Sequence, residues 1–142
     1  MIIPIPAYKP DQSLVRLARA LREQDATAEI FVIDDGSGST YAHIFTELRL
    51  DGVTVRTHST NRGKGAALRT GIEWARANRP GEVVVTADAD GQHLPRDIFR
   101  VGARTESAGL RATGHRPGRT HPTGSGCGRG RYQSAPALTN RQ

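Results

Sequence analysis

The stretch Glu29-Ile30-Phe31-Val32-Ile33-Asp34-Asp35-Gly36-Ser37 decides the fold. Its apolar part is rich in branched and aromatic side chains, which favour a buried β-strand. The aspartates, glycine and serine that follow are typical of a turn, so the strand is expected to end at Ile33. A strand that is apolar along its whole length implies covering helices, and helical patterns flank it on both sides.

Apolar residues recur at helical spacing before and after this strand. In the helix expected over residues 64–77, we predict that Leu68, Ile72 and Ala75 face the interior. The expected helices begin close to Asp11, Tyr41, Lys64 and Pro95.

Further apolar runs at residues 2–6, 53–57 and 83–87 are predicted to be strands. Strands that alternate with amphipathic helices favour right-handed crossovers, and hence an α/β fold with a mainly parallel sheet and helices on both faces. Ligands bind beyond the carboxyl ends of the strands in such sheets. We therefore expect function in the residues that follow each strand.

Asp88 and Asp90 follow the last of these strands and lie two positions apart, so an extended backbone projects both carboxylates to the same side. Because like charges repel, the pair favours a neutralising cation. Mg²⁺ or Mn²⁺ suits oxygen ligands, and the amide of Gln92 could add a further oxygen. The alternative interpretation is a polar turn without metal.

Asp34 and Asp35 follow the strand that decides the fold. They could accept hydrogen bonds from a ribose or a base, and an Asp-rich turn that caps the next helix is an equally good interpretation. The dinucleotide fingerprint is absent, because Pro6-Ala7-Tyr8 stands where glycines would be needed. The sequence therefore disfavours a dinucleotide-dependent dehydrogenase.

The run Asn61-Arg62-Gly63-Lys64-Gly65 lacks the Gly-Lys-Ser/Thr ending of a nucleoside triphosphatase loop. Lys64 at a helix start could still meet an anion such as a diphosphate, and a solvated basic turn is the alternative. Of the histidines, His58 is expected to be structural, whereas His93 could approach a phosphate or a metal.

Residues 106–142 differ sharply from the rest of the chain. They hold six Arg against a single acidic residue, Glu106, and contain no Val, Ile, Phe, Met or Trp. Most of the net charge of +6 therefore belongs to them. A segment with so little apolar surface is expected to be disordered. We predict a folded domain over residues 1–105 and a disordered Gly/Arg/Pro-rich tail over residues 106–142.

The sequence contains no apolar run of about 18 residues that would predict a membrane-spanning helix. Residues 1–9 lack the pattern of a secretory signal. The single cysteine, Cys127, excludes an intramolecular disulfide and a cysteine-built zinc site. We expect a cytoplasmic protein, either free or in peripheral contact with a membrane surface.

Four motifs that follow the expected strands occur in order: Ile5-Pro6-Ala7-Tyr8-Lys9-Pro10, Val32-Ile33-Asp34-Asp35-Gly36-Ser37, Asn61-Arg62-Gly63-Lys64-Gly65-Ala66-Ala67-Leu68 and Thr86-Ala87-Asp88-Ala89-Asp90-Gly91-Gln92-His93. Together they resemble the family-2 glycosyltransferases, and most closely the dolichyl- or polyprenyl-phosphate mannose or glucose synthase branch. The match covers about residues 1–105, which corresponds to the nucleotide-sugar-binding half of the family's GT-A fold.

The resemblance implies roles for the first two motifs. Pro6, Ala7 and Tyr8 would line the nucleotide pocket, with the Tyr8 ring beside the base. Asp35, together with Asp34, would contact the base or the ribose.

The last motif matches the family's Asp-x-Asp element. Asp88 would face the ribose or sugar and join the metal shell, and Ala89 would belong to the same nucleotide-sugar-binding element. Asp90 with Gln92 would bind the divalent metal. The implied reaction is the inverting transfer of a hexose from a GDP- or UDP-sugar to a polyprenyl phosphate or another acceptor, with Mg²⁺ or Mn²⁺ stabilising the leaving diphosphate.

The resemblance ends at about residues 101–105, before the half that would supply the acceptor pocket and any base. No catalytic residue is therefore assigned. We expect no turnover from such a half-domain, which could bind nucleotide weakly, expose an unpaired sheet edge and apolar surface, or fail to fold. The abrupt change of composition suggests, as a hypothesis, a reading-frame shift or a truncated gene product, which sequencing of the encoding DNA would test.

Two other functions stay open at this point. The Arg/Gly-rich tail could contact nucleic-acid phosphates, but Tyr132 is its only aromatic ring and no recognition motif is present, so no nucleic-acid partner is expected. A metal-dependent nucleotidyltransferase also pairs carboxylates at strand ends. Pyrophosphate release would distinguish that activity from sugar transfer.

Overall fold

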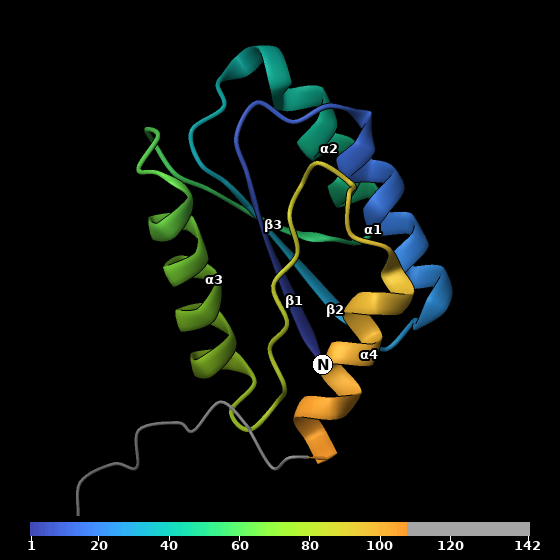
Figure 1. Ribbon diagram of the computed structural model, residues 1–142. Coiled ribbons are helices and arrows are strands. Elements are labelled where there is room, and N and C mark those ends of the chain that lie inside the picture. The colour runs from blue at the N-terminus through green and yellow to red at the C-terminus, as the bar shows by residue number, and fades with distance from the viewer. Residues whose placement is uncertain (108–142) are drawn as a thin grey trace, which may run out of the picture.

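The computed structural model describes residues 1–107, in which strands and helices alternate (Figure 1). The predicted α/β class is confirmed, and the expected helices begin within one or two residues of their predicted starts. The elements are β1 (Ile2–Ala7), α1 (Gln12–Gln24), β2 (Glu29–Asp34), the 3-10 helix η1 (Ser39–Tyr41), α2 (Ala42–Leu50), β3 (Thr54–Thr57), α3 (Lys64–Asn78) and α4 (Pro95–Ser107).

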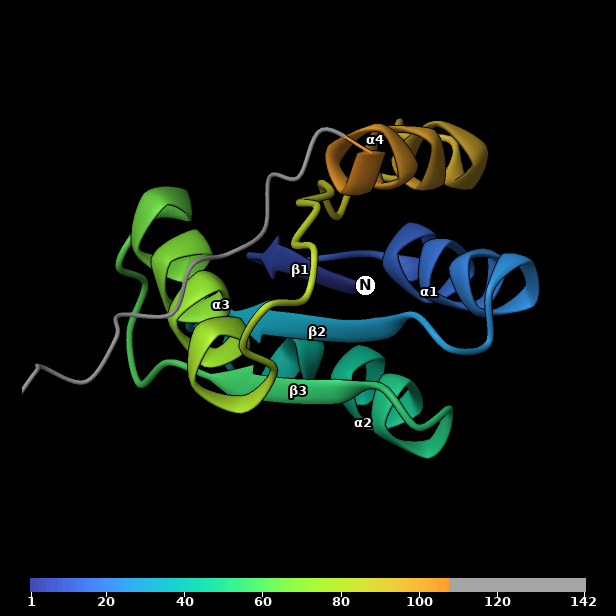
Figure 2. The same ribbon diagram turned by 90° about the horizontal axis from the view of Figure 1, so that it is seen from below.

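The strands form one parallel sheet in the order β1-β2-β3. Ile5 of β1 lies opposite Val32 of β2, and Ile33 lies opposite Arg56 of β3. Figure 2 shows α3 on one face of this sheet and α1, α2 and α4 on the other. Both faces are therefore covered by helices, as the strand and helix pattern predicts.

The prediction of a fourth strand at residues 83–87 is wrong, because no regular strand forms there. Within residues 1–107, the segment joins the sheet through an isolated bridge between Ile2 and Val84. The Ile2 N–H donates to the Val83 carbonyl at 2.8 Å, and the Val85 N–H donates to the Ile2 carbonyl at 3.0 Å. The segment runs beside β1 without the regular ladder of a strand.

The reason lies in the sequence of β1. Its even-numbered positions face the 83–87 segment, and at two of them, Pro4 and Pro6, the backbone has no N–H to donate. The Pro4 carbonyl still accepts from the Ala87 N–H at 3.3 Å. The prolines leave the other edge of β1 intact, because the N–H groups that pair with β2 belong to the odd-numbered residues.

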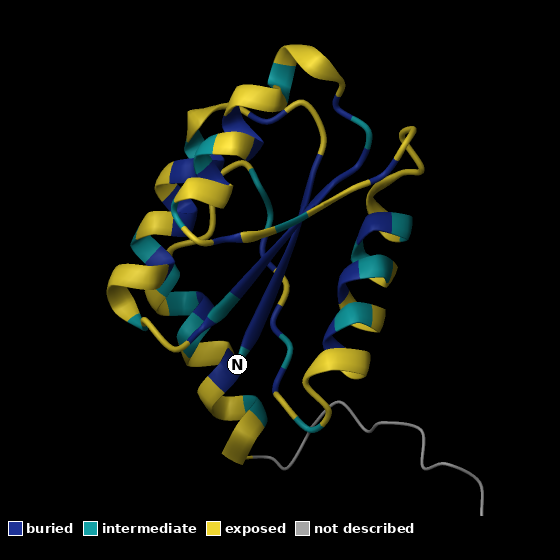
Figure 3. Cartoon of the chain, turned by 180° about the vertical axis from the view of Figure 1, so that it is seen from behind, coloured by how far each residue is buried: buried dark blue, intermediate teal, exposed yellow. Residues whose placement is uncertain are grey.

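The larger core fills the space between the sheet and α1, α2 and α4. β1 and β2 are buried almost throughout, whereas β3 is an exposed edge (Figure 3). Leu14 and Leu21 of α1 and Leu48 of α2 are fully buried against the sheet. Burial of such side chains contributes about 1.5–3 kcal/mol each, so this core carries most of the stability.

A smaller core lies beneath α3. The rings of Phe31 and Trp74 are stacked there, with centroids 4.4 Å apart and planes 11° from parallel. The interior face predicted for α3 is partly wrong: Ala75 is buried, but Leu68 is half-buried and Ile72 is 39% exposed.

The buried positions of α3 are instead occupied by small residues, Ala67, Gly71 and Ala75. A Cβ at Gly71 would lie 2.6 Å from the Cβ of Pro4 and 3.0 Å from Cδ1 of Ile33. The helix therefore approaches the sheet more closely than larger residues would allow. Apolar periodicity pointed to the larger residues of α3, but this close approach requires the smaller ones.

Of the predicted tail, only Glu106 and Ser107 are described, and both belong to the last turn of α4. The remainder of the tail, including Cys127, lies outside the described residues. Among residues 1–107, no helix combines the length and the apolar character that a membrane crossing requires.

Candidate functional site

Two adjoining hollows lie at the carboxyl end of β1, where parallel sheets bind ligands. The first, which we call the acidic cleft, has a volume of about 320 Å³. The second, the Asp35 cleft, has a volume of about 260 Å³. The residues common to both linings are Pro6, Tyr8 and Lys64, so the clefts are two parts of one site.

The linings bring together most of the residues that the sequence singles out. The acidic cleft is lined by Pro6, Tyr8, Lys9, Pro10, Asp11, Lys64, Asp88, Ala89 and Asp90. The Asp35 cleft is lined by Pro6, Ala7, Tyr8, Asp35, Asn61, Gly63, Lys64 and Ala67.

Two of the predicted site residues lie elsewhere. Asp34 lines neither cleft, is 5% exposed, and its Oδ1 accepts a hydrogen bond from the Ser37 backbone N–H at 2.9 Å. Gln92 also lines neither cleft, and its backbone N–H donates to Oδ1 of Asp90 at 3.0 Å. In this structure Asp34 stabilises the turn after β2, and Gln92 supports the loop that carries Asp90.

Lys64 and Asp88 form an ion pair across the acidic cleft. The Lys64 Nζ lies 2.7 Å from Oδ1 of Asp88, and the His93 Nε2 lies 3.7 Å from its Oδ2. The hydrogen bond from Lys64 lowers the pKa of the Asp88 carboxyl below its ordinary value. The Lys64 side chain is well exposed and that of Asp88 is partly exposed, so solvent reaches the ion pair.

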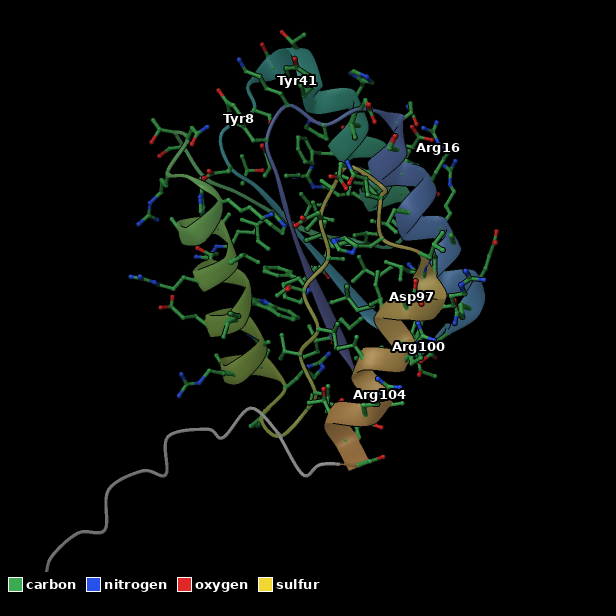
Figure 4. All side chains as sticks on the ribbon, in the orientation of Figure 1. Tyr8, Arg16, Tyr41, Asp97, Arg100 and Arg104 are labelled. Atoms are coloured by element: carbon green, nitrogen blue, oxygen red, sulfur yellow. The ribbon has the colours of Figure 1, made fainter. Side chains whose placement is uncertain are left out.

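Tyr8 forms the outer wall shared by the two clefts. It is 47% exposed, and the Lys9 Nζ lies 5.1 Å from the centre of its ring. A hydrogen bond to the Asn61 side chain lowers the pKa of the Tyr8 hydroxyl. Figure 4 shows Tyr8 at the end of the molecule opposite Arg104, which lies on α4.

The carboxylate oxygens of the acidic cleft suit a hard cation only if a bound molecule supplies further oxygen atoms. Among the described residues, no group of three or more His, Cys, Asp or Glu side chains could hold a metal ion by itself. Asp88 and Asp90 nevertheless line the same cleft and offer carboxylate oxygens, the ligand type that Mg²⁺ and Mn²⁺ prefer. The arrangement fits a cation that is held jointly by the protein and by phosphate oxygens.

Asp35 lies at the buried side of the other cleft. Its side chain is 3% exposed, and Oδ1 accepts hydrogen bonds from His58 Nδ1 at 2.7 Å and from the Arg62 backbone N–H at 3.0 Å. Burial raises the pKa of Asp35, but the N–H of Arg62 and the ring of His58 outweigh it and hold the pKa below its ordinary value. Asp35 is therefore a hydrogen-bond acceptor at neutral pH.

The role of His58 as a partner of Asp35 cannot be read from sequence spacing, because the two residues are 23 positions apart. The available signal was that both follow adjacent strands of one parallel sheet. Gly36 is a further requirement, since a Cβ there would lie 2.5 Å from the Thr60 carbonyl carbon. Only glycine lets the loop after β3 come so close to the turn after β2.

The chain matches known glycosyltransferases in sequence. The pattern of the family described as glycosyl transferase family 2 matches residues 2–119. An uncharacterized protein of Methanocaldococcus jannaschii is 35% identical over 101 residues, covering 71% of this chain and 40% of the relative. The polyprenol monophosphomannose synthase of Mycolicibacterium smegmatis is 31% identical over 124 residues, covering 84% of this chain and 46% of the relative.

A structural match agrees with these relatives. The mannosyltransferase PcManGT from Pyrobaculum calidifontis, in complex with GDP-Man and Mn²⁺, aligns with a TM-score of 0.52 and 26% sequence identity. The alignment covers 63% of this chain and 27% of that one. The chain thus spans less than half the length of these proteins. With its family pattern, its relatives and its parallel sheet, the chain belongs to glycosyl transferase family 2, and its described residues form part of a GT-A fold.

Proposed function

We propose that this chain binds a nucleoside diphosphate sugar, a GDP- or UDP-hexose, together with Mg²⁺ or Mn²⁺. In this proposal it is the donor-binding part of an inverting transferase whose acceptor is a lipid phosphate such as polyprenyl phosphate. The observation that carries the proposal is the continuity of the two clefts. Tyr8 and Lys64 line both clefts. Asp35, a buried hydrogen-bond acceptor, lines one of them, and Asp88 and Asp90 line the other.

The nucleoside would occupy the Asp35 cleft. Its walls at Pro6, Ala7 and Tyr8 are largely apolar and suit the faces of a base and a ribose. Asp35 would accept hydrogen bonds from N–H or O–H groups of the nucleoside, because its carboxylate is ionised and offers about four lone-pair positions.

The diphosphate and the sugar would occupy the acidic cleft. Asp90 and Asp88 would hold the cation with phosphate oxygens, and Ala89 between them would leave room for the sugar. Lys64 and the N-terminus of α3 would face the diphosphate, because helix N-termini and ammonium groups favour anions. Gln92 would contribute to the cation only if the loop after Asp90 rearranged.

Transfer of the sugar requires that the negative charge of the leaving diphosphate is stabilised. A bound divalent cation supplies charge neutralisation as the bond between sugar and phosphate breaks. Lys64 adds a positive charge on the same side, and Asp35 keeps the nucleoside in place while charge develops. A lipid phosphate acceptor is already anionic and needs no strong base, so the described residues need not contain one.

The relatives support this class of donor and acceptor. The Mycolicibacterium smegmatis relative is a polyprenol monophosphomannose synthase, and the Pyrobaculum calidifontis structure holds GDP-Man and Mn²⁺. A polyprenyl phosphate acceptor would lie in a membrane, so peripheral contact with a membrane surface is part of the proposal.

The test is isothermal titration of the full chain with GDP or UDP in the presence of Mn²⁺. We expect one of the nucleotides to bind, and Asp90→Asn to weaken that binding by about tenfold or more, since a carboxylate ligand of the cation is lost. Asp97→Asn is the control, because it removes the same charge on α4, where Asp97 pairs with Arg100 and lines neither cleft. A folded wild-type protein that binds neither nucleotide would contradict the proposal.

A further inference from the structure

A buried polar cluster joins three separate elements behind the Asp35 cleft. It consists of Asp35 after β2, His58 after β3 and Thr70 in α3, and we call it the Asp35–His58–Thr70 cluster. The side chains of Asp35 and His58 are 3% and 6% exposed. Buried polar groups of this kind are costly unless they are hydrogen-bonded, so their arrangement is strongly specified.

Both nitrogens of the His58 ring are engaged. Nδ1 lies 2.7 Å from Oδ1 of Asp35, and because an ionised carboxylate only accepts, Nδ1 carries the proton of this bond. Nε2 lies 3.0 Å from the Thr70 hydroxyl, which is also 3.1 Å from the Ala66 carbonyl of the same helix. The ring therefore links the Asp35 carboxylate to the first half of α3.

The link matters because α3 carries other parts of the site. Ala67 and Lys64 line the Asp35 cleft, and Thr70 lies less than one helical turn beyond Ala67. The backbone N–H of Arg62, just before the helix, makes the other hydrogen bond to Oδ1 of Asp35. His58 and the start of α3 thus hold the carboxylate from two sides.

We propose that His58 is a positioning residue for the donor: it holds the Asp35 carboxylate against the nucleoside part of the ligand without touching that ligand. The inference rests on the proposed function of the site. It assigns to His58 a selective effect on nucleoside recognition. Neither hydrogen-bond partner of the ring, Asp35 or Thr70, lines the acidic cleft, which would hold the diphosphate and the cation.

A purely structural histidine would behave differently. Its loss would loosen the loops after β2 and β3 together and weaken every ligand of the site to a similar extent. A positioning residue affects the part of the ligand that meets Asp35 and leaves the remainder unchanged. A substitution that restores the donor to Asp35 should also restore its effect.

Two amide substitutions separate these cases. In His58→Asn the side-chain nitrogen stands where Nδ1 was and can donate to Asp35, whereas in His58→Gln the nitrogen stands nearer the place of Nε2 and can reach Thr70 instead. Both variants keep a polar group in the buried space. The pair therefore matches size and polarity closely while changing which partner is reached.

The experiment compares the affinities of the wild-type chain, His58→Asn and His58→Gln for two probes. The first is GDP or UDP with Mn²⁺, whichever the wild type binds more tightly, and the second is inorganic pyrophosphate with Mn²⁺. We expect His58→Gln to lose about 10- to 100-fold in nucleotide affinity, because a hydrogen bond to a charged group is lost, and His58→Asn to stay within about fivefold of wild type. Pyrophosphate affinity should remain within about twofold in both.

Thr70→Val tests the other end of the cluster, and it keeps the inference testable if the His58 variants do not fold. It removes the hydroxyl and keeps the shape of the side chain, so a smaller loss of nucleotide affinity, about two- to fivefold, is expected. Circular dichroism and thermal unfolding establish that each variant is folded before titration.

Equal losses for both probes, or equal losses in His58→Asn and His58→Gln, would overturn the inference and leave the proposed function standing. Unchanged nucleotide affinity in all three variants would do the same. A wild-type chain that binds pyrophosphate but neither nucleotide would overturn the proposed function, and the positioning role of His58 with it.

Discussion

At the scale of single residues, the site depends on carboxylates with different surroundings. Asp35 is buried and held by N–H donors, whereas Asp88 is exposed and meets a lysine. The first is a fixed acceptor, and the second can exchange its partner for another cation. The difference gives each carboxylate a separate test.

Asp35→Asn tests the buried carboxylate through the pH dependence of folding. Because the folded protein lowers the pKa of Asp35, this group stabilises the fold above the unfolded pKa of about 3.9 and loses its effect as the pH falls through the lower folded value. We expect Asp35→Asn to lower the free energy of unfolding by about 1–3 kcal/mol near pH 7.

That difference from wild type should shrink as the pH falls below about 4. Urea unfolding at a series of pH values measures it, with Asp97→Asn as the exposed control. A difference that grew toward acid would show that the folded state does not favour the ionised form of Asp35.

Lys64→Met tests the ion pair in the acidic cleft. Removing the ammonium frees Asp88 for a metal, so we expect Mn²⁺ alone to bind about two- to fivefold more tightly, in line with the small energy of an exposed pair. Under the proposed function, nucleotide affinity should fall, because the positive charge that would face the diphosphate is lost. Lys64→Arg keeps the charge and is the control.

Titration calorimetry with Mn²⁺ and then with nucleotide plus Mn²⁺ measures both changes. The two shifts have opposite signs, which a general loss of structure cannot produce. Loss of affinity for both ligands would show that Lys64 does not compete with the metal.

At the scale of elements, α3 is the part that sequence periodicity describes least well. Its length and its start at Lys64 follow from the sequence, but its interior face does not. Gly71 faces the sheet because Pro4 and Ile33 leave no space for a side chain. That requirement comes from a distant strand, so a local pattern cannot contain it.

Gly71→Ala is expected to lower the free energy of unfolding by about 1–3 kcal/mol, because the new methyl group would overlap the Pro4 ring. Gly65→Ala is the matched control in the same helix, where a Cβ meets nothing within 4 Å. It should be neutral or stabilising by less than about 1 kcal/mol. Chemical denaturation of both variants makes the comparison, and equal effects would contradict the close approach of α3 to the sheet.

The 83–87 segment is buried like a strand but is not paired like one. Its apolar residues predict a buried strand, and Val83, Val85 and Ala87 are all buried. Regular pairing fails because of Pro4 and Pro6 on the neighbouring strand. A prediction made from one segment at a time cannot include the hydrogen bonds that its neighbour is unable to supply.

At the scale of the whole molecule, the order of the motifs and the parallel topology were enough to predict which residues after the strands lie close together. Because carboxyl ends of parallel strands meet at one edge, Tyr8, Asp35 and Asp88 could be expected to lie together, and they line the adjoining clefts. The side-chain network behind the clefts could not be predicted. It depends on the relative rotation of β2, β3 and α3, which sequence periodicity does not specify.

Unequal pairing across the sheet should appear in amide hydrogen exchange. We expect the N–H groups of Val85 and Ala87 to exchange at least about tenfold faster than that of Ile33, which faces β1 in the regular β1–β2 ladder. Nuclear magnetic resonance on the full chain measures the individual rates. Equal protection would mean that the 83–87 segment opens only together with the β1–β2 pair.

The prolines of β1 also affect how the backbone before Asp88 and Asp90 is held. The segment that precedes Asp88 and Asp90 is joined to β1 by an interrupted row of backbone hydrogen bonds, whereas β1 and β2 are paired along their whole length. A shift of this segment relative to Lys64 would break the ion pair between Lys64 and Asp88, but no hydrogen bond that joins β1 to β2. Because Pro4 and Pro6 have no amide proton, Asp88 and Asp90 follow a segment with few backbone hydrogen bonds, whereas Tyr8 follows a strand that is regularly paired with β2.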